Sequence, residues 1–523
     1  MKVVHVNTWD VAGGAATAMY RWHRALVDGG ADSSVLCCVK NSDDPTVFSD
    51  VNLISENRAA YADIVQSAYL DSNRTPISNT HFSHPFGKYG IREHHIVKAA
   101  DIVHLHWFSH FVDLSDLLAL KRAGKTVVLT PHDLWAVTGG CHFPGECRQF
   151  LSQCYPCPLL EEDPVAFVPA CQQVKTEVLT NILDGIICPS HWISTEFAAH
   201  ANFCRVPRSV VPYCLDEQNF GPEDKLVARK EIGIAPEKLV ILFVAHHVNE
   251  LRKGFGSFMD LLQRLASNAA FVKEHRSSLK FVIIGSYPKS MPLNTDFDVE
   301  LCGFVSDRAK LRRYFSAADL LLYTGNQDNL PNVIIESLAC GTPVLAFRAG
   351  GVPDMLEERV NGFMAPVGDT EQLERILRNL VADRTVLGSM ATACVHSAMQ
   401  KFSPSAILPQ LLQCYDTILH QRTSKSSLDV LTSKQKYSEI PSEVTAEAYA
   451  LAARKLREFQ RELQEVSRDG QEKEKLISTI SQELERDSRN IRNQTKTISH
   501  LESVTGWLRY QFRRIVDTIK SHQ

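Results

Sequence analysis

Short apolar runs alternate with amphipathic stretches along the first part of the chain. VVHVN at 3–7 is followed by a helix-like segment at 17–30 and then by SSVLCCV at 33–39. Further strand-like runs, each ending in small or polar residues, lie at 101–107, 126–133 and 184–190. This alternation is typical of βαβ units in a parallel sheet, whose strands are buried on both faces. The pattern predicts an α/β fold with a doubly wound domain.

A second series of the same kind follows a polar, proline-containing link that begins near residue 209. Its strand-like runs lie at 239–247, 279–286, 318–325 and 342–347. Helical windows separate them, so we expect two Rossmann-like domains in tandem, residues 1–212 and 213–423. The carboxyl ends of two such sheets can face one ligand across a cleft, which suits a transferase with two substrates.

The end of the chain has a different character. Residues 424–444 are polar and strand-free, which is typical of a linker. Residues 445–523 contain no proline and are rich in helix formers, with apolar positions spaced as in a coiled coil. The tail either self-associates weakly or forms a solvated or folded-back helix. Its basic end, 505–523, fits an anionic membrane surface or further helical association equally well.

Composition narrows the class of protein. The 523 residues are 44% apolar and 22% charged with a formal net charge of -4, so a surface for nucleic acid is not expected. The chain opens with a strand pattern and has neither a signal-peptide pattern nor an apolar run of about eighteen residues. We therefore expect a cytoplasmic protein. Most of the 14 cysteines are scattered singly through apolar segments, as reduced buried thiols are.

Two acidic residues mark the segment with the clearest chemical pattern. A strand is predicted to end at Tyr323, Asp328 lies on the polar loop beyond it, and Glu336 is expected at the start of the next helix. A carboxylate at a helix start is stabilised by free N–H groups and can accept bonds from two vicinal hydroxyls, as on ribose. Glu336 is our candidate for that contact, and Asp328 for contacts with the hydroxyls of a second sugar.

Two glycine pairs and an asparagine are candidates for binding the rest of such a ligand. Gly350 and Gly351 follow the next strand, and Gly13 and Gly14 open the first helix after VVHVN. Glycines at these turns let backbone N–H groups approach phosphate oxygens. Asn332 lies between the two acids in the sequence and is a candidate for the same ligand-binding role as the glycines.

The string QDNLPNVIIESLACGTPVLAF, from residue 327, resembles glycosyltransferase family 4. Its members carry two glutamates with seven residues between them, followed by A-x-G-x-P-V; here Asp328 stands in the first place and Glu336 in the second. The string is particularly similar to bacterial exopolysaccharide transferases of the colanic-acid type. The resemblance covers about residues 1–422. It implies a GT-B fold, with an acceptor domain followed by a donor domain and a helix that crosses back to the first.

The resemblance also implies an activity and roles for further residues. The activity is retaining, metal-independent transfer of a sugar from a UDP- or GDP-linked donor to a glycan or lipid-linked acceptor. An Arg and a Lys after the first strand of the donor domain would neutralise the β-phosphate. Lys253 precedes Gly254 as the family pattern expects, but Val248 stands where the family has Arg, and Arg252 is the substitute available. His132, in TPHD, would lie beside the donor sugar.

No general base is evident in the sequence, and the resemblance does not require one. In front-face displacement the leaving phosphate itself accepts the proton of the acceptor. Two rival functions stay open. One is an inactive relative that binds nucleotide-sugar or glycan and scaffolds a biosynthetic complex, and the other is sugar-nucleotide epimerisation on the same architecture.

A cluster of cysteines lies outside the general family pattern. Cys141, Cys147, Cys154 and Cys157 fall within seventeen positions, in a segment for which we expect little core. Thiolates at this spacing can converge on a tetrahedral zinc ion. A structural zinc, a redox-labile CxxC and simple packing are the three interpretations. No cofactor is expected for catalysis, and the cluster is expected to brace a loop on the acceptor side.

Overall fold

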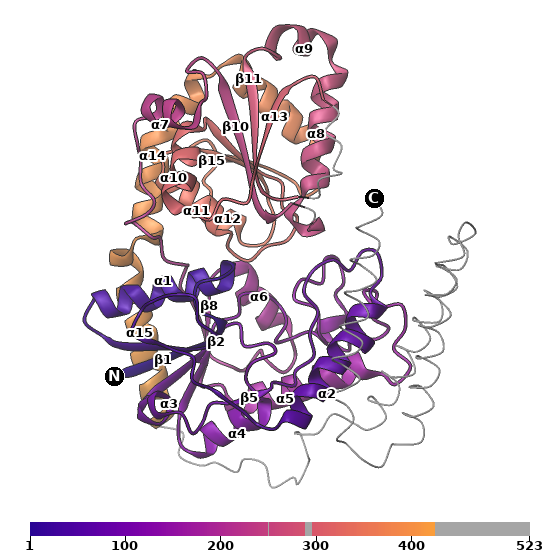
Figure 1. Ribbon diagram of the computed structural model, residues 1–523, viewed down its shortest axis with the longest axis vertical. Helices are drawn as coiled ribbons and strands as arrows, with labels where there is room; N and C mark the ends of the chain where they lie inside the picture. Colours follow the sequence, from indigo (N-terminus) through magenta and orange to yellow (C-terminus); the bar gives the residue numbers. More distant parts are fainter. Residues whose placement is uncertain (249, 288–294, 424–523) are drawn as a thin grey trace, which may run out of the picture.

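The computed structural model describes residues 1–248, 250–287 and 295–423. The predicted linker at 424–444 and the predicted helical tail at 445–523, with its basic end, lie outside the described residues. Within the described ranges, no helix combines the length and the apolar character needed to cross a membrane. Figure 1 shows two α/β bodies stacked along the long axis of the molecule.

The first domain is built on a seven-stranded parallel sheet with the order β3-β2-β1-β6-β7-β8-β9. The order reverses between β1 and β6, and ligands of doubly wound sheets bind at such a switch point. The strands are β1 Lys2–Trp9, β2 Asp32–Val39, β3 Val47–Phe48, β6 Ile102–Leu105, β7 Thr126–Leu129, β8 Gly185–Cys188 and β9 Arg208–Val210. The helices are α1 Gly14–Asp28, α3 His95–Ala99, α4 Leu114–Arg122, α5 Phe167–Ile182 and α6 His191–Ala199, with the 3-10 turn η3 Gln149–Leu151.

An excursion between β3 and β6 is a feature for which the alternating pattern makes no prediction. It contains α2 Glu56–Ile64, the π-helix η1 Val65–Leu70, the 3-10 turn η2 Asp71–Asn73, and a small antiparallel sheet of β4 Asn52–Leu53 and β5 Tyr89–Gly90. The rings of Tyr69 and Phe86 pack against Phe167 of α5. The excursion therefore extends the core of the first domain.

The second domain has a six-stranded parallel sheet with the order β12-β11-β10-β13-β14-β15. Its strands are β10 Leu239–His247, β11 Leu279–Ser286, β12 Asp298–Gly303, β13 Leu320–Tyr323, β14 Val344–Phe347 and β15 Gly362–Ala365. Its helices are α7 Lys225–Ile232, α8 Phe255–Ser267, α9 Ala269–His275, α10 Arg308–Ala317, α11 Asn332–Ala339, α12 Val352–Met355, α13 Thr370–Ala382 and α14 Thr385–Phe402, with the 3-10 turn η4 Leu251–Lys253.

Local sequence explains why these elements begin and end where they do. The short central strands of both sheets are buried along their whole length, so they read as continuous apolar runs. Side-chain oxygens of Ser190, Asp307 and Asp369 cap the helices α6, α10 and α13 by accepting backbone N–H groups of the first turn. The prediction of an α/β fold with two Rossmann-like domains is confirmed.

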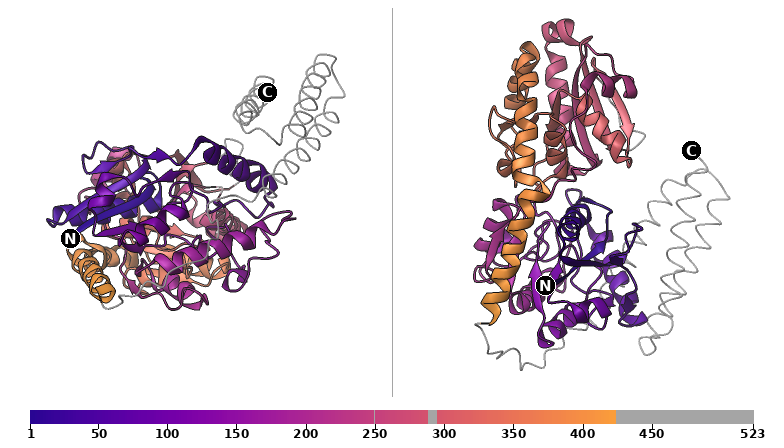
Figure 2. Two further views of the ribbon diagram at one scale, coloured as in Figure 1. Left: turned by 90° about the horizontal axis from the view of Figure 1, so that it is seen from below. Right: turned by 90° about the vertical axis from the view of Figure 1, so that its left-hand side faces the viewer.

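The last described helix, α15 Pro404–Thr423, joins the two domains. It follows α14 of the second domain directly and runs along the first domain, as the right-hand view of Figure 2 shows. Ile407, Leu411 and Tyr415 are fully buried there in one cluster with side chains of β1, β6, β7 and β8. The chain thus ends its described part on the domain in which it began.

Candidate active site

The loop after β13 carries Asp328, whose carboxylate is surrounded by donors. One oxygen, Oδ2, accepts hydrogen bonds from Lys253 Nζ at 2.6 Å, the Tyr323 hydroxyl at 2.9 Å and Arg252 at 3.2 Å. The other accepts the backbone N–H of Asn329 at 2.9 Å. Burial alone raises the pKa of Asp328, but the two cations and the hydrogen bonds outweigh it and hold the pKa well below its usual range. Asp328 is therefore an ionised group that orients two cations.

The loop that supplies these cations, after β10, depends on a glycine for its position. Gly254 has φ 75°, and a Cβ atom there would lie 1.7 Å from the carbonyl oxygen of Thr324. The Thr324 hydroxyl in turn donates to the carbonyl of Gly254 at 2.8 Å, and the N–H of Asn326 donates to the carbonyl of Arg252 at 2.9 Å. Backbone contacts thus fasten the cationic loop to the Asp328 loop, at the carboxyl ends of neighbouring strands β10 and β13.

The two cations differ in their electrostatic surroundings. Burial lowers the pKa of Arg252, but Asp328 and Glu250 outweigh this effect, and the pKa is raised above its ordinary value. Arg252 Nε lies 2.6 Å from Glu250 Oε1. For Lys253, burial and the neighbouring guanidinium together lower the pKa. The structure thus brings Arg252 beside Lys253 on one carboxylate, and the contact of both with a phosphate stays a prediction.

The sequence led us to expect Glu336 at the start of a helix, but the helix begins earlier. The helix α11 starts at Asn332 because Pro331 ends the extended loop before it, and Glu336 is its fifth residue. Its carboxylate is buried and accepts a hydrogen bond from the Arg21 guanidinium of α1 at 2.6 Å. Burial raises the pKa of Glu336, and Arg21 opposes the rise without cancelling it. The expected contact of Glu336 with ribose stays a prediction. In this structure the Glu336 carboxylate is bound to Arg21.

The glycine pair of the first helix lies against the start of α11. The side-chain N–H of Asn332 donates to the carbonyl of Gly14 at 3.2 Å, and Arg21 donates to the other end of the Asn332 amide at 3.3 Å. Gly13 has φ 90° and turns the chain from β1 into α1. The domain interface therefore brings Gly14 to Asn332, and Arg21 to both Asn332 and Glu336, while phosphate contacts of Gly13 and Gly14 stay predictions.

The second glycine pair makes room for the Asp328 loop. Cβ atoms at Gly350 and Gly351 would lie 1.8 Å from the carbonyl oxygens of Asp328 and Asn329, respectively. The N–H of Gly351 donates to the carbonyl of Asp328 at 3.2 Å. These glycines therefore have a packing role, and their predicted contact with a phosphate is untested.

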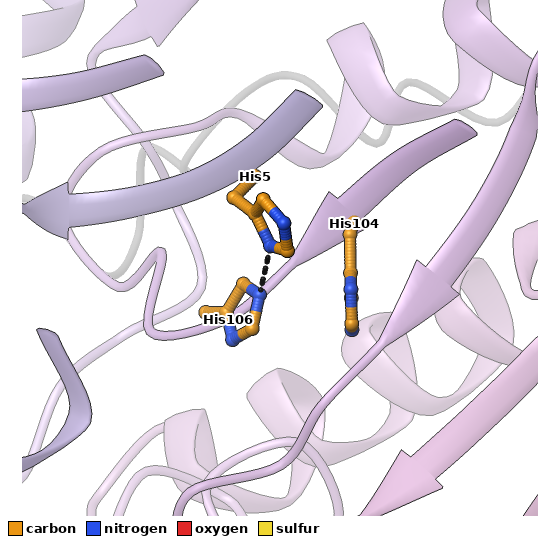
Figure 3. A group of neighbouring side chains, drawn as sticks. All are labelled: His5, His104 and His106. Carbon is orange, nitrogen blue, oxygen red and sulfur yellow. Dashed lines mark hydrogen bonds between the residues drawn. The ribbon is translucent and has the colours of Figure 1, made fainter. Parts of the chain in front are cut away.

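His132, after β7, belongs to a chain of buried hydrogen-bonding side chains. Its Nδ1 lies 2.7 Å from the Tyr213 hydroxyl, and its Nε2 lies 3.0 Å from His106 Nδ1. His106 is in turn 2.9 Å from His5 of β1, the pair joined by the dashed line in Figure 3. Protein groups thus engage both ring nitrogens of His132, which fixes the ring, and its place beside a donor sugar stays a prediction.

His5, His104 and His106 form a compact group whose ligand atoms lie within 4.8 Å of one another (Figure 3). Burial lowers the pKa of all three imidazoles, that of His104 to about 3, so they are neutral. His104 places its nitrogens 2.7 Å from the Tyr415 hydroxyl and 2.8 Å from the Thr130 hydroxyl. Since these partners occupy both nitrogens of His104, we interpret the group as a hydrogen-bonded core array.

Sequence reasoning missed several residues that complete the site. Asn329 donates to the carbonyl of Pro131 at 3.0 Å and accepts from the Ser190 hydroxyl at 2.6 Å, so it joins the two domains directly beside Asp328. Asn329 directly follows Asp328 in the sequence, so it could have been predicted as a site residue from its position. No local pattern points to Arg21 or Tyr213, because their partners are more than eighty positions away in the chain.

Part of the cysteine segment after His132 is buried, including Phe150, so it contains more core than the sequence led us to expect, although residues 145–146, 152–153 and 155–156 are exposed. Cys141 and Cys154 belong to the first domain's apolar cluster, and Cys157 packs against it. The segment also contacts the second domain: the Arg252 guanidinium lies 3.9 Å from the centre of the Phe143 ring, and the N–H of residue 145 donates to the Gln327 side chain at 2.8 Å. The segment therefore meets the cationic loop and the Asp328 loop.

Comparison with known proteins places the second domain in a family. Residues 238–383 match the family described as "Glycosyl transferases group 1". The chain is 23% identical over 210 residues to N-acetyl-alpha-D-glucosaminyl L-malate synthase of Bacillus anthracis, covering 39% of this chain and 51% of that protein. It is 22% identical over 327 residues to WcaC of Escherichia coli, a protein named for glycosyl transfer in colanic acid biosynthesis, covering 61% and 75%.

The chain spans about half the length of the first of these relatives. A third relative is also matched over about half of its length. This is the lipopolysaccharide core biosynthesis glycosyltransferase LpsE of Rhizobium meliloti, 26% identical over 200 residues, with 37% of this chain and 55% of that protein covered.

Solved structures share the fold of the described residues. Sucrose-phosphate synthase from Thermosynechococcus elongatus superimposes with a TM-score of 0.54 at 15% identity, covering 80% of this chain and all of that one. HepE of Anabaena in complex with UDP and glucose gives 0.52 at 16% identity, with the same coverage. These likenesses concern architecture alone, since identity is low. Residues 238–383 thus match the glycosyl transferases group 1 family, and the described residues share the GT-B fold of these structures.

Proposed function

We propose that the protein is a retaining glycosyltransferase that moves a sugar from a nucleotide diphospho-sugar to a glycan or lipid-linked acceptor in polysaccharide biosynthesis. The observation that carries this proposal is the pair of partly buried cations, Lys253 and Arg252, held on Asp328 at the face where the domains meet. A second acid, Glu336, and the amide of Asn332 lie at the same interface.

The proposed chemistry needs positive charge at the leaving group. When the bond between sugar and diphosphate breaks, negative charge develops on the β-phosphate. Cations that are already oriented can stabilise this charge by roughly 3 to 4 kcal/mol per contact, because no side chain has to reorganise. Asp328 keeps Lys253 and Arg252 close together, with Nζ 2.6 Å and the guanidinium 3.2 Å from one carboxylate oxygen. A diphosphate can then share both cations without a metal ion.

Retention of configuration follows if the acceptor attacks from the side of the leaving phosphate. The phosphate oxygen then accepts the proton of the attacking hydroxyl, so no separate protein base is required. The interface must exclude water during this step, since water would compete as acceptor. His132 is neutral, because burial lowers its pKa to about 4. We assign it to the wall of the donor-sugar site, oriented by Tyr213.

The substrate class rests on the named relatives. HepE is described in complex with UDP and glucose, and LpsE and WcaC are named for biosynthesis of lipopolysaccharide core and colanic acid. A UDP- or GDP-hexose is therefore the donor to test first, with an oligosaccharide or a lipid-linked sugar as acceptor. Self-association and membrane contact through the tail stay predictions, since that segment lies outside the described residues.

The test is transfer or donor hydrolysis with a panel of radiolabelled nucleotide sugars in the presence of EDTA. We expect turnover in the wild type. We expect Lys253→Met and Glu336→Gln to lower kcat/KM by at least about 100-fold, the loss typical of removing one group that stabilises the transition state. Lys273→Met is the matched control, because Lys273 is an exposed residue of α9. It should leave turnover unchanged.

Three outcomes would contradict the proposal. If the protein binds nucleotide but turns over no donor of the panel, it is better described as a scaffold that has lost catalysis. The ion pair between Arg21 and Glu336 would then persist when nucleotide is bound. Turnover that survives in Lys253→Met places the diphosphate elsewhere. Retention is checked separately by the anomeric proton coupling of the product, and an inverted product would refute the front-face step.

A further inference from the structure

Four cysteines of the first domain surround one small cavity. Cys141, Cys147, Cys154 and Cys157 all line it, together with the apolar ring of Phe82. Cys141 and Cys154 are buried, and Cys147 and Cys157 lie half-buried at its outer side. The set therefore combines an inner pair with an outer pair that solvent can reach. This is the arrangement that a metal ion entering from solvent requires.

Backbone donors point at two of these sulfur atoms. The N–H of Gly139 donates to Cys154 Sγ at 3.2 Å. Backbone N–H groups of Leu159 and Leu160 donate to the sulfur of Cys157. Such bonds orient the sulfur lone pairs and favour the thiolate form that ligates metals, although burial outweighs them and raises the pKa of both thiols.

A buried lysine beside the cluster lacks a carboxylate partner. Lys175 of α5 is fully buried, and its ammonium donates to the carbonyl of Trp135 at 2.5 Å and lies 4.2 Å from the centre of that ring. Among the described residues, Lys175 forms no ion pair with a carboxylate within 4.0 Å, and the groups that act on its charge are the sulfurs of Cys171, Cys141 and Cys154 and, after them, Asp133. A buried ammonium is costly unless negative charge compensates it, and a metal ion that held the cluster's cysteines as thiolates would supply that charge.

We propose that Cys141, Cys147, Cys154 and Cys157 bind one structural zinc ion, with Lys175 as the buried counter-charge. Four thiolates and one Zn²⁺ carry a net charge of -2, and the ammonium compensates half of it. Binding releases up to four thiol protons to solvent and changes no oxidation state. The cysteines are not among the groups of described residues whose ligand atoms lie within 4.8 Å of one another, so zinc must draw the sulfurs together.

The zinc would fix the part of the first domain that meets the donor domain. Between Cys141 and Cys147, the ring of Phe143 stacks on Arg252, and the backbone of residue 145 bonds Gln327. A metal at the base of this segment therefore determines where the segment touches the cationic loop. Zinc content is measured without a transferase substrate, so this inference and the proposed function can fail independently.

The experiment is metal analysis of the full chain, purified without chelator, by plasma mass spectrometry. We expect about one zinc per chain and at most traces of iron, as for a closed four-cysteine site. Cobalt substituted for zinc should give the intense visible absorption of tetrahedral cobalt with thiolate ligands. Removal of zinc with a mercurial reagent should expose four additional thiols to titration.

Variants separate the zinc site from general effects on folding. We expect Cys147→Ser, at a half-buried position, to lose most of its zinc while its circular dichroism is kept. Cys204→Ser is the control, because Cys204 is exposed and outside the cluster. It should keep its zinc. We expect Lys175→Met to release zinc to a competing chelator at about 10-fold lower chelator concentration, the range for partners that tune a metal site.

Three results would overturn the inference. The first is less than about 0.2 zinc per chain in wild type, well below the full occupancy of a structural site. The second is a mass two hydrogens lower that maps to a disulfide between any two of the four cysteines. The third is a wild-type zinc content that Cys147→Ser and Cys154→Ser both retain. If both variants unfold, thiol titration and metal analysis of the wild type alone still decide.

Discussion

At the scale of single residues, the candidate site consists of charges that compensate one another across two domains. Asp328 receives three donors on one oxygen, and Glu336 receives the Arg21 guanidinium. The sequence motif predicts the two acids but does not indicate these partners, which, apart from Tyr323 at the end of β13, lie on another loop or on the other domain. A nucleotide that takes over either carboxylate must therefore replace protein contacts that exist in its absence.

The Asp328 network makes a prediction about pH. Because folding lowers the pKa of Asp328, its stabilising effect is complete above the unfolded value of about 3.9 and fades as the pH falls toward the folded value. We expect Asp328→Asn to lower the free energy of unfolding by about 3 kcal/mol at pH 7, since two partly buried cations lose a charged partner. Urea unfolding should show a constant difference from wild type between about pH 7 and pH 5, and a difference that shrinks as the pH falls below the unfolded value of about 4. A difference that grows toward acid would contradict the ionised state.

The Arg21–Glu336 pair allows a comparison between buried and exposed ion pairs on one helix. Arg21→Met leaves a buried carboxylate without its cation and should cost about 3 to 5 kcal/mol of unfolding free energy. Arg24→Met, on the same helix, removes the half-exposed contacts with Asp28 and Asp44 and should cost at most about 1 kcal/mol. If Arg21→Met and Arg24→Met lower the free energy of unfolding equally in chemical denaturation, the buried Arg21–Glu336 ion pair does not stabilise the fold more than an exposed pair.

At the scale of elements, the sequence predicts the strands better than it predicts the helix boundaries or the packing of the cysteine segment. Parallel strands buried on both faces produce continuous apolar runs, so β10, β11, β13 and β14 follow from the sequence. Helix boundaries were less certain: α11 begins at Asn332, four positions before Glu336, because Pro331 fixes the loop's end. The buried part of the cysteine segment was missed, since its apolar partners come from α5 and from the excursion before β6, far away in sequence.

The turn from η4 into α8 gives a prediction with a matched control two positions away. Gly254→Ala places a Cβ atom 1.7 Å from the Thr324 carbonyl at φ 75°, so the cationic loop must move away from the Asp328 loop. We expect a loss of at least about 2 kcal/mol in stability and a large fall in kcat. Gly256→Ala meets no atom within 4 Å inside α8 and should be neutral or stabilise by up to about 1 kcal/mol. Thermal unfolding and donor turnover check both.

At the scale of the whole molecule, α15 determines how the two sheets face each other. The helix leaves the second domain and buries Ile407, Leu411 and Tyr415 against β1, β6, β7 and β8 of the first. The direct contacts between the two domains elsewhere, such as the bond between Ser190 and Asn329, are mainly hydrogen bonds and ion pairs. The apolar helix therefore supplies the firm connection, and the polar interface can rearrange when a ligand enters.

This division of roles predicts that damage to α15 affects turnover more than nucleotide binding. Leu411→Ala opens a cavity in the α15 contact and should cost about 2 to 5 kcal/mol of stability in the first domain. The donor groups Lys253, Arg252 and Glu336 all lie on the second domain, so the Kd for the nucleotide should change by less than about 3-fold, whereas kcat should fall because the acceptor side is displaced. Isothermal titration and initial rates measure the two quantities. Gln410→Ala, at an exposed neighbouring position, should alter neither. A Leu411→Ala variant that loses nucleotide affinity in proportion to kcat would show instead that the first domain contributes to nucleotide binding itself, through Gly13 and Gly14.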